Sequence, residues 1–245
     1  MLFIIPWSEY YIGRSECDFA HYPERAPEGV VRLATYLKNK GAEVRIADMQ
    51  YLLRKNCGSI AAAMDALWGI CLDFAPEVMG FSFFTARFEF ASDIFFKIKT
   101  RYTEATLPLP LLIGGGVHPT LLPSLTLRHI PFDAVIIGEG ERPLENLLAL
   151  DSWDNLGKIP GIFTAYSSVA EHGEIVENLD EVPMPDWDLI NKEYYSQPSY
   201  LLLGKRLDRV IPISFSRSCA YKCNFCAHNC FLKARCRLRQ TILRL

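Results

Sequence analysis

Short apolar runs alternate with amphipathic segments along the first 150 residues of this 245-residue chain. The apolar runs predict buried strands at residues 2–5, 43–47, 78–83, 111–113 and 134–137. The amphipathic segments predict helices at residues 29–40, 61–74, 88–102, 121–127 and 143–150. This alternation is typical of a parallel sheet covered by helices on both faces. We therefore expect residues 1–150 to form an α/β domain with a flavodoxin-like, doubly wound parallel sheet of about five strands.

The alternation of strands and helices stops after Asp151. A hairpin is predicted within residues 161–177, and the stretch LDEVPMPDWDLI follows it. Pro183 and Pro185 exclude regular secondary structure from this stretch. We expect residues 151–208 to form a linker that lies on another part of the molecule.

Three of the predicted strands end in glycines or hydroxyl-bearing residues, at the edge where parallel sheets bind ligands. Glycine lets a ligand approach the main chain closely, so these strand ends predict the floor of a large cofactor site. Their spacing differs from the GxGxxG pattern of dinucleotide sites. The candidate residues are Ser82, Phe83 and Thr85; Gly114, Gly115, Gly116 and His118; and Gly138, Glu139 and Gly140.

These strand ends also have a simpler interpretation. The three successive glycines could form a tight turn that leaves His118 on the surface. Glu139 and Glu141 could favour the N-terminus of the following helix through its dipole. The sequence leaves both interpretations open.

Charge is unevenly distributed along the chain. Residues 201–245 carry ten Lys or Arg and a single acid, Asp208, although the whole chain has a net charge of −2. The rest of the chain is therefore strongly acidic. A basic end on an acidic body can meet a phosphate or a carboxylate-bearing ligand, or remain a solvated tail.

The sequence shows neither a signal peptide nor a membrane span. The apolar start ends at Pro6, without the basic start and cleavage site of a signal peptide. No stretch approaches the roughly 20 apolar residues that cross a bilayer. We expect a cytoplasmic protein, in which closely spaced thiols indicate a metal site before they indicate disulfides.

Three cysteines, Cys219, Cys223 and Cys226, form a C-x3-C-x2-C pattern. Three thiolates can bind three irons of a four-iron cluster and leave the fourth iron open for a substrate. A structural zinc site would need a fourth ligand, Cys230 or His228, and a fully cysteine-ligated electron-transfer cluster would need Cys230. No ligand role is assigned to the remaining cysteines, Cys17, Cys57, Cys71 and Cys236.

The loop SRSCAYKCNFC resembles the cluster loop of radical S-adenosylmethionine (radical SAM) enzymes, including the aromatic Phe225 just before the last cysteine. A strand predicted at residues 210–215 stands where the partial (β/α) barrel of that family begins, so residues 209–245 resemble the start of such a barrel. The segments GGGVHPT, GEGE and LDEVPMPDWDLI resemble the cobalamin-binding domain and linker of the cobalamin-dependent branch. The resemblance covers nearly the whole chain.

The resemblance implies three cofactors: a four-iron four-sulfur cluster on the three cysteines, S-adenosylmethionine chelated by the open iron, and cobalamin against the strand ends. In the family the reduced cluster cleaves S-adenosylmethionine to a 5′-deoxyadenosyl radical, which takes hydrogen from an unactivated carbon, and methylcobalamin can donate a methyl group. The implied partners are an external electron donor and a small-molecule substrate, such as a tetrapyrrole, lipid or natural product, but no nucleic acid. The DxHxxG motif is absent, so cobalamin would bind without a protein ligand to cobalt.

A radical SAM barrel needs roughly 200 residues, and about 35 follow Val210. We expect the chain to hold only the first strand and the cluster loop of the barrel, and to be inactive by itself because it is truncated. No catalytic residue is assigned. Two alternatives stay open: a non-catalytic cobalamin-binding module and a zinc-binding α/β protein.

Overall fold

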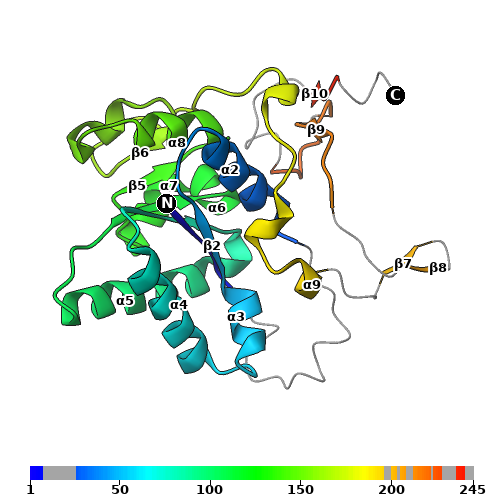
Figure 1. Ribbon diagram of the computed structural model, residues 1–245. Coiled ribbons are helices and arrows are strands. Elements are labelled where there is room, and N and C mark those ends of the chain that lie inside the picture. Colours follow the sequence, from blue (N-terminus) through cyan, green and yellow to red (C-terminus); the bar gives the residue numbers. More distant parts are fainter. Residues whose placement is uncertain are drawn as a thin grey trace.

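The computed structural model describes residues 1–7, 26–195, 200–202, 205–207, 212–221, 223–227 and 236–240. Most of these residues form a six-stranded sheet with helices on both faces (Figure 1). The strands of this sheet are β1 (Leu2–Ile5), β2 (Arg45–Asp48), β3 (Val78–Ser82), β4 (Leu111–Gly115), β5 (Ala134–Ile136) and β6 (Ile162–Phe163).

The helices lie between the strands and in the segment that follows the sheet. They are α2 (Glu28–Asn39), α3 (Met49–Lys55), α4 (Ile60–Phe74), α5 (Phe88–Glu104), α6 (Val117–Leu121), α7 (Pro123–His129), α8 (Glu141–Leu148) and α9 (Lys192–Tyr195). Short 3-10 turns occur at Thr85–Arg87, Trp153–Lys158, Leu179–Glu181 and Trp187–Leu189. Within the described ranges, no helix has both the length and the apolar character needed to cross a membrane.

The strand order of the sheet is β2-β1-β3-β4-β5-β6. β1 to β5 are parallel, and β6 runs antiparallel to β5. The parallel part has the flavodoxin-like order 2-1-3-4-5, in which the direction of winding reverses between β1 and β3. The predicted doubly wound parallel sheet is thus confirmed, and β6 adds an antiparallel edge strand.

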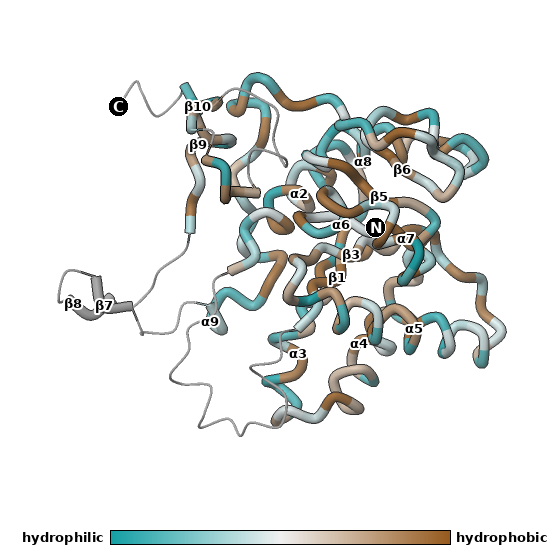
Figure 2. Tube along the Cα trace, turned by 180° about the vertical axis from the view of Figure 1, so that it is seen from behind, coloured by the Kyte–Doolittle hydropathy of each residue, from teal (hydrophilic) through white to brown (hydrophobic). Residues whose placement is uncertain are grey.

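Both faces of the sheet are buried. Leu2 and Ile4 of β1 belong to a core that includes residues of α3, α4 and α5. Phe3 and Ile5 point to the other face and belong to a second core with α2 and α8. Strands buried on both faces have continuous apolar sequences without alternation, and Figure 2 shows how apolar the central strands are.

Two side chains cap helices on the first of these faces. The Ser59 hydroxyl accepts a hydrogen bond from the backbone N–H of Ala62 at the start of α4. The Asp48 carboxylate accepts hydrogen bonds from the backbone N–H groups of Gln50 and Tyr51, and so caps the start of α3. α3 was not predicted, because only a strand was expected at residues 43–47 and no helix cap was expected at Asp48.

The hairpin predicted within residues 161–177 is wrong. The first half of it, β6, pairs with β5, and residues 174–177 form no strand in the described structure. Without β6, β5 would present a row of unpaired main-chain groups at the edge of the sheet. β6 also lies beyond residue 150, where the sequence analysis placed the end of the first domain.

The predicted linker lies along α2 and reaches α3. The backbone N–H of Asp186 donates to Oγ1 of Thr35 at 2.8 Å, and Nζ of Lys38 lies 2.8 Å from the Asp186 carboxylate. Further along, the phenol of Tyr195 donates to the Asp48 carboxylate. In Figure 1 this segment runs, in yellow, past α2 to α9. Because the prolines prevent a long helix or strand in this segment, its polar groups can make such contacts with the domain.

The described residues from 200 onward include two small two-stranded sheets, of which the first lies within the predicted linker of residues 151–208. β7 (Tyr200–Leu202) pairs with β8 (Lys205–Leu207), and β9 (Ser216–Arg217) pairs with β10 (Arg237–Leu238). The strand predicted at residues 210–215 is wrong over residues 212–215, which form no strand. In a barrel, the main-chain N–H and C=O groups of each strand bind the neighbouring parallel strands. Here the main-chain groups of Ser214 instead bind side chains of α2.

Candidate functional site

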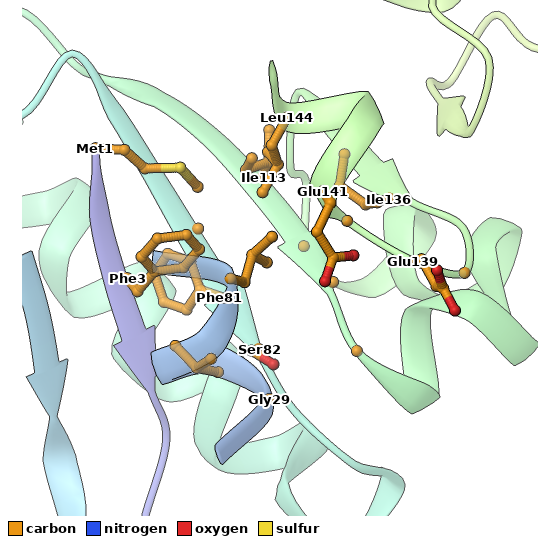
Figure 3. Close-up of a pocket in the computed structure, with 18 of the residues that line it drawn as sticks. Met1, Phe3, Gly29, Phe81, Ser82, Ile113, Ile136, Glu139, Glu141 and Leu144 are labelled. Atoms are coloured by element: carbon orange, nitrogen blue, oxygen red, sulfur yellow. The ribbon is translucent and has the colours of Figure 1, made fainter. Parts of the chain in front are cut away.

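A pocket of about 320 Å³ opens between α2, α8 and the carboxyl ends of β3, β4 and β5 (Figure 3). Met1 and, in β1, Phe3 contribute one side of it, and Leu144 of α8 contributes another. Arg217, from the basic end of the chain, also lines the pocket. Seven of the ten predicted cofactor residues line it as well: Ser82, Gly114, Gly115, Gly116, Gly138, Glu139 and Gly140.

Gly115 leaves the floor of the pocket open. A Cβ atom on this residue would meet Cβ of Ile136 at 3.9 Å and the backbone oxygen of Phe81 at 4.0 Å, which are ordinary contacts. A side chain at position 115 would therefore occupy the pocket without displacing the protein around it. The missing side chain at Gly115 is space that a ligand can use.

The other candidate glycines serve the fold. Gly116 has a φ of +95°, and a Cβ there would lie 2.9 Å from the backbone oxygen of Phe83. Gly138 has a φ of +87°, and a Cβ there would lie 2.8 Å from Nδ1 of His172. These two glycines make turns that other residues cannot make without strain.

Two further candidate glycines allow close packing. A Cβ on Gly114 would lie 3.0 Å from the ring of Phe132, which belongs to the core on the far face of the sheet. A Cβ on Gly140 would lie 3.0 Å from Cδ2 of Leu33, so this glycine brings the start of α8 close to α2. Both glycines shape the pocket indirectly, by setting the positions of the strand and the helix that line it.

Phe83, Thr85 and His118 lie away from the pocket. Phe83 and His118 are buried side chains whose rings lie 5.8 Å apart, and Phe88 packs 4.5 Å from the His118 ring. Nδ1 of His118 lies 3.1 Å from Oγ1 of Thr85. Only 2% of His118 is exposed, so the alternative interpretation of His118 as a surface residue is wrong. Burial lowers the pKa of His118, which favours the neutral ring.

The two acids of the GEGE motif are buried and bind arginines. The Glu139 and Glu141 side chains are 6% and 5% exposed. Nη2 of Arg217 lies 2.5 Å from Glu141, and its Nη1 lies 3.2 Å from Glu139. Glu139 also pairs with Arg237. Burial opposes the charge on Arg217, but its ion pairs with Glu141 and Glu139 outweigh burial and raise the pKa of Arg217.

The sequence analysis assigned Glu139 to a cofactor and did not foresee this pairing with the basic end. The uneven charge distribution was the signal for it: the carboxylates that the basic end meets belong to the chain itself. Glu141 also stands in the first turn of α8, as the helix-dipole interpretation expects. Figure 3 shows its carboxylate directed into the pocket.

Cys219, Cys223 and Cys226 are all exposed, and their loop begins two residues after Arg217. The backbone N–H of Cys226 donates to the carbonyl of Cys223 at 3.0 Å. Across the described residues, no three Cys, His, Asp or Glu side chains are grouped closely enough to hold a metal ion. Cys230, His228 and Cys17 lie outside the described residues.

The cysteines without an assigned role occupy other surroundings. Cys71 is buried in α4, and burial raises the pKa of its thiol to about 12. Its thiol is therefore protonated and unreactive at neutral pH. Cys57 and Cys236 are exposed.

Comparisons with known proteins agree with this geometry. The family model described as "B12 binding domain" matches residues 24–148, which contain β2 to β5 and most of the pocket lining. The chain is 29% identical over 167 residues to the "Uncharacterized methyltransferase PH0819" of Pyrococcus horikoshii, covering 63% of this chain and 32% of that protein. It is 29% identical over 137 residues to the anaerobic magnesium-protoporphyrin IX monomethyl ester cyclase of Synechocystis, covering 54% of this chain and 26% of the cyclase.

A solved structure shares the fold. The cobalamin-dependent S-adenosylmethionine radical enzyme OxsB, with aqua-cobalamin and S-adenosylmethionine bound, superposes with a TM-score of 0.66 at 21% identity. The match covers 92% of this chain and 28% of OxsB. The chain thus spans about a third or less of the length of each of these three proteins.

Proposed function

The chain belongs to the family of B12-binding domains, and from that premise we propose that the pocket between α2 and α8 holds part of a cobalamin. The observation that carries this proposal is the open floor at Gly115. A pocket of about 320 Å³ can take the heterocyclic arm of a cobalamin but is too small for the corrin ring. The corrin would then lie outside the pocket, over the carboxyl ends of the strands.

The residues of the pocket suit such an arm. Phe3, Ile113 and Ile136 offer apolar contacts to a flat ring system, and burial of that ring provides most of the binding free energy. The Ser82 hydroxyl offers a polar contact at the end of β3. A bound methylcobalamin supplies a transferable methyl group, and this chain binds and orients the cofactor and excludes water from its arm.

We further propose that Cys219, Cys223 and Cys226 bind a four-iron four-sulfur cluster. Three exposed thiols within eight residues are a suitable donor set, and the short loop lets them gather around a cluster that is delivered to it. Such a cluster supplies the electron that cleaves S-adenosylmethionine. The position of Arg217 supports the proposal, because it places the start of this loop beside the cobalamin pocket.

The reaction of the whole protein is then a radical methylation, or a related radical transformation, of a small molecule, with an external electron donor. Two curated relatives, a methyltransferase and a cyclase of a magnesium porphyrin ester, support this class of chemistry. In this proposal the described domain provides the cobalamin and the first anchoring point of the cluster.

Two measurements test the proposed function. Anaerobic cobalamin titration, followed by its absorbance spectrum, should show saturable binding in the micromolar range or weaker. Reconstitution with iron and sulfide should give an oxygen-sensitive cluster with iron and acid-labile sulfide in equal amounts. Binding of cobalamin without a cluster would leave only a non-catalytic cobalamin-binding module. Binding of stoichiometric zinc, with neither cofactor retained, would indicate a zinc-binding α/β protein and contradict the proposal.

A further inference from the structure

The segment of residues 212–221, here called the docked segment, is attached to the sheet domain through charged groups. Its first attachment is at Ser214. The Ser214 N–H and hydroxyl donate to the Glu28 carboxylate at 2.7 and 2.6 Å, and Nη2 of Arg32 donates to the Ser214 carbonyl at 2.9 Å. Both partners lie on α2, the helix that forms one side of the pocket.

The second attachment of the docked segment is Arg217. Its guanidinium bridges the two buried carboxylates Glu139 and Glu141, which line the pocket just before and at the start of α8. The docked segment is therefore attached both to α2, at Ser214, and to the start of α8, at Arg217. β9 and β10 lie near α2 in both views of the molecule (Figures 1 and 2).

A third attachment supports the second strand of this small sheet. Arg237 pairs with Glu139 and donates to the carbonyl of Val176 at 2.6 Å. Arg239 donates to the carbonyl of Val182, and its backbone N–H donates to the carbonyl of Phe215. β10 thus pairs with β9 and is itself attached to the residues around Glu139, Val176 and Val182.

We propose that Arg217 is a positioning residue, which fixes the loop of Cys219, Cys223 and Cys226 beside the mouth of the cobalamin pocket by neutralising Glu139 and Glu141. This inference rests on the proposed function, because it explains how the loop proposed to bind the cluster is held close to the pocket proposed to bind cobalamin. Cys219 follows Arg217 by two residues, so the position of the guanidinium determines where the cluster loop starts.

The physical reason lies in the burial of the two acids. A buried carboxylate that loses its cation is strongly destabilised, and Arg217 is the arginine that pairs with the buried Glu141, whereas Glu139 also pairs with Arg237. Without Arg217, the Glu141 carboxylate loses this partner and regains hydration only if the docked segment moves away and lets water in. Loss of this one side chain should therefore release the segment while the sheet stays folded.

Hydrogen–deuterium exchange on the full chain, without cofactors, tests the inference first. In Arg217→Met, exchange within residues 212–221 should rise by on the order of tenfold or more, while β3 and β4 keep their protection. Arg217→Lys retains the charge and should keep most of the protection. The matched control is Arg45→Met, which breaks the exposed ion pair between Arg45 on β2 and Asp73 on α4. It should leave the exchange of residues 212–221 unchanged.

A spectroscopic measurement on the loaded protein tests the cofactor geometry. Cob(II)alamin and a reduced cluster are both paramagnetic, so their proximity broadens the cobalt signal. Wild type and Arg217→Lys should show this broadening, and Arg217→Met should bind both cofactors and lose it. Unchanged exchange, or unchanged broadening, in Arg217→Met would overturn the inference. Failure of wild type to bind cobalamin would instead count against the proposed function, and the exchange experiment would still decide the role of Arg217.

Discussion

Gly115 lies beside Ile136 on the adjacent strand, and a Cβ atom on Gly115 would stand 3.9 Å from the Cβ of Ile136. The two residues share the floor of the pocket, but only Ile136 carries a side chain on it. This difference makes position 115 the place where the volume of the pocket can be changed with the least effect on the rest of the fold.

Gly115→Val should weaken cobalamin binding by about tenfold or more, because its methyl groups would fill the space proposed for the cofactor arm. The free energy of unfolding should change little. Titration followed by absorbance measures the affinity, and circular dichroism confirms the fold. Gly69→Ala in α4 is the control, since a Cβ on Gly69 would meet no other group within 4 Å and α4 lies on the other face of the sheet. An unchanged affinity in a folded Gly115→Val protein would remove this pocket from the proposal.

Gly116→Ala changes the next residue and should lower the stability of the fold, whereas Gly115→Val should leave it almost unchanged. The backbone of Gly116, with φ of 95° and ψ of −164°, lies in a region that only glycine adopts readily, and a Cβ would lie 2.9 Å from the Phe83 carbonyl oxygen. The free energy of unfolding should fall by about 2 kcal/mol or more. Urea unfolding measures this loss, with Gly115→Ala as the near-neutral comparison. Equal losses for the two variants would contradict the assignment of separate roles.

His118 should make the protein less stable in mild acid. Burial lowers its folded-state pKa, so below about pH 6.5 the unfolded chain takes up a proton that the folded chain resists. Stability therefore falls as the pH drops from there toward the lowered pKa. Between about pH 7.5 and 5.5, the free energy of unfolding should fall less in His118→Phe than in wild type, by on the order of 1 kcal/mol, as measured by urea unfolding. His129→Phe, at an exposed histidine, should leave the loss unchanged.

The sequence was sufficient to predict the sheet and the edge at which the pocket opens, because buried strands and the glycines after them have strong local patterns. It did not separate Ser82 from Phe83, although successive residues of a strand point to opposite faces. Ser82 faces the pocket and Phe83 faces the core beneath α5. The alternation rule, applied to the strand end, would have shown this.

Other features depend on contacts between distant parts of the chain. Arg217 and Glu141 are separated by 76 residues, and the charge distribution indicates a meeting of basic and acidic regions without naming the partners. The short run at β6 suits a hairpin or an edge strand equally well. Its choice of β5 depends on the unpaired edge that the folded sheet presents, which the sequence does not display.

Phe163→Ala should show that β6 is an integral part of the domain. Phe163 is a buried member of the core beneath α4 and α5, so its truncation should lower the free energy of unfolding by about 3 kcal/mol. Tyr166→Ala removes another aromatic ring three residues later, at a side chain that is 98% exposed, and should cost almost nothing. Urea unfolding compares the two variants. Similar stabilities would mean that the sheet is complete without β6.

The cysteines provide the test of the cluster proposal. Cys219→Ala, Cys223→Ala and Cys226→Ala should each abolish the iron content of about four atoms per chain and the matching visible absorbance after reconstitution. In the proposed cluster each thiolate would hold a different iron, so loss of one would leave a cluster with two protein ligands. Cys57→Ala removes an exposed thiol on the sheet domain and should retain the full cluster. The decisive variant is Cys230→Ala. Retention of its cluster leaves one iron open for S-adenosylmethionine, whereas loss equal to that of the other three would indicate a fully ligated cluster and contradict radical chemistry at this loop.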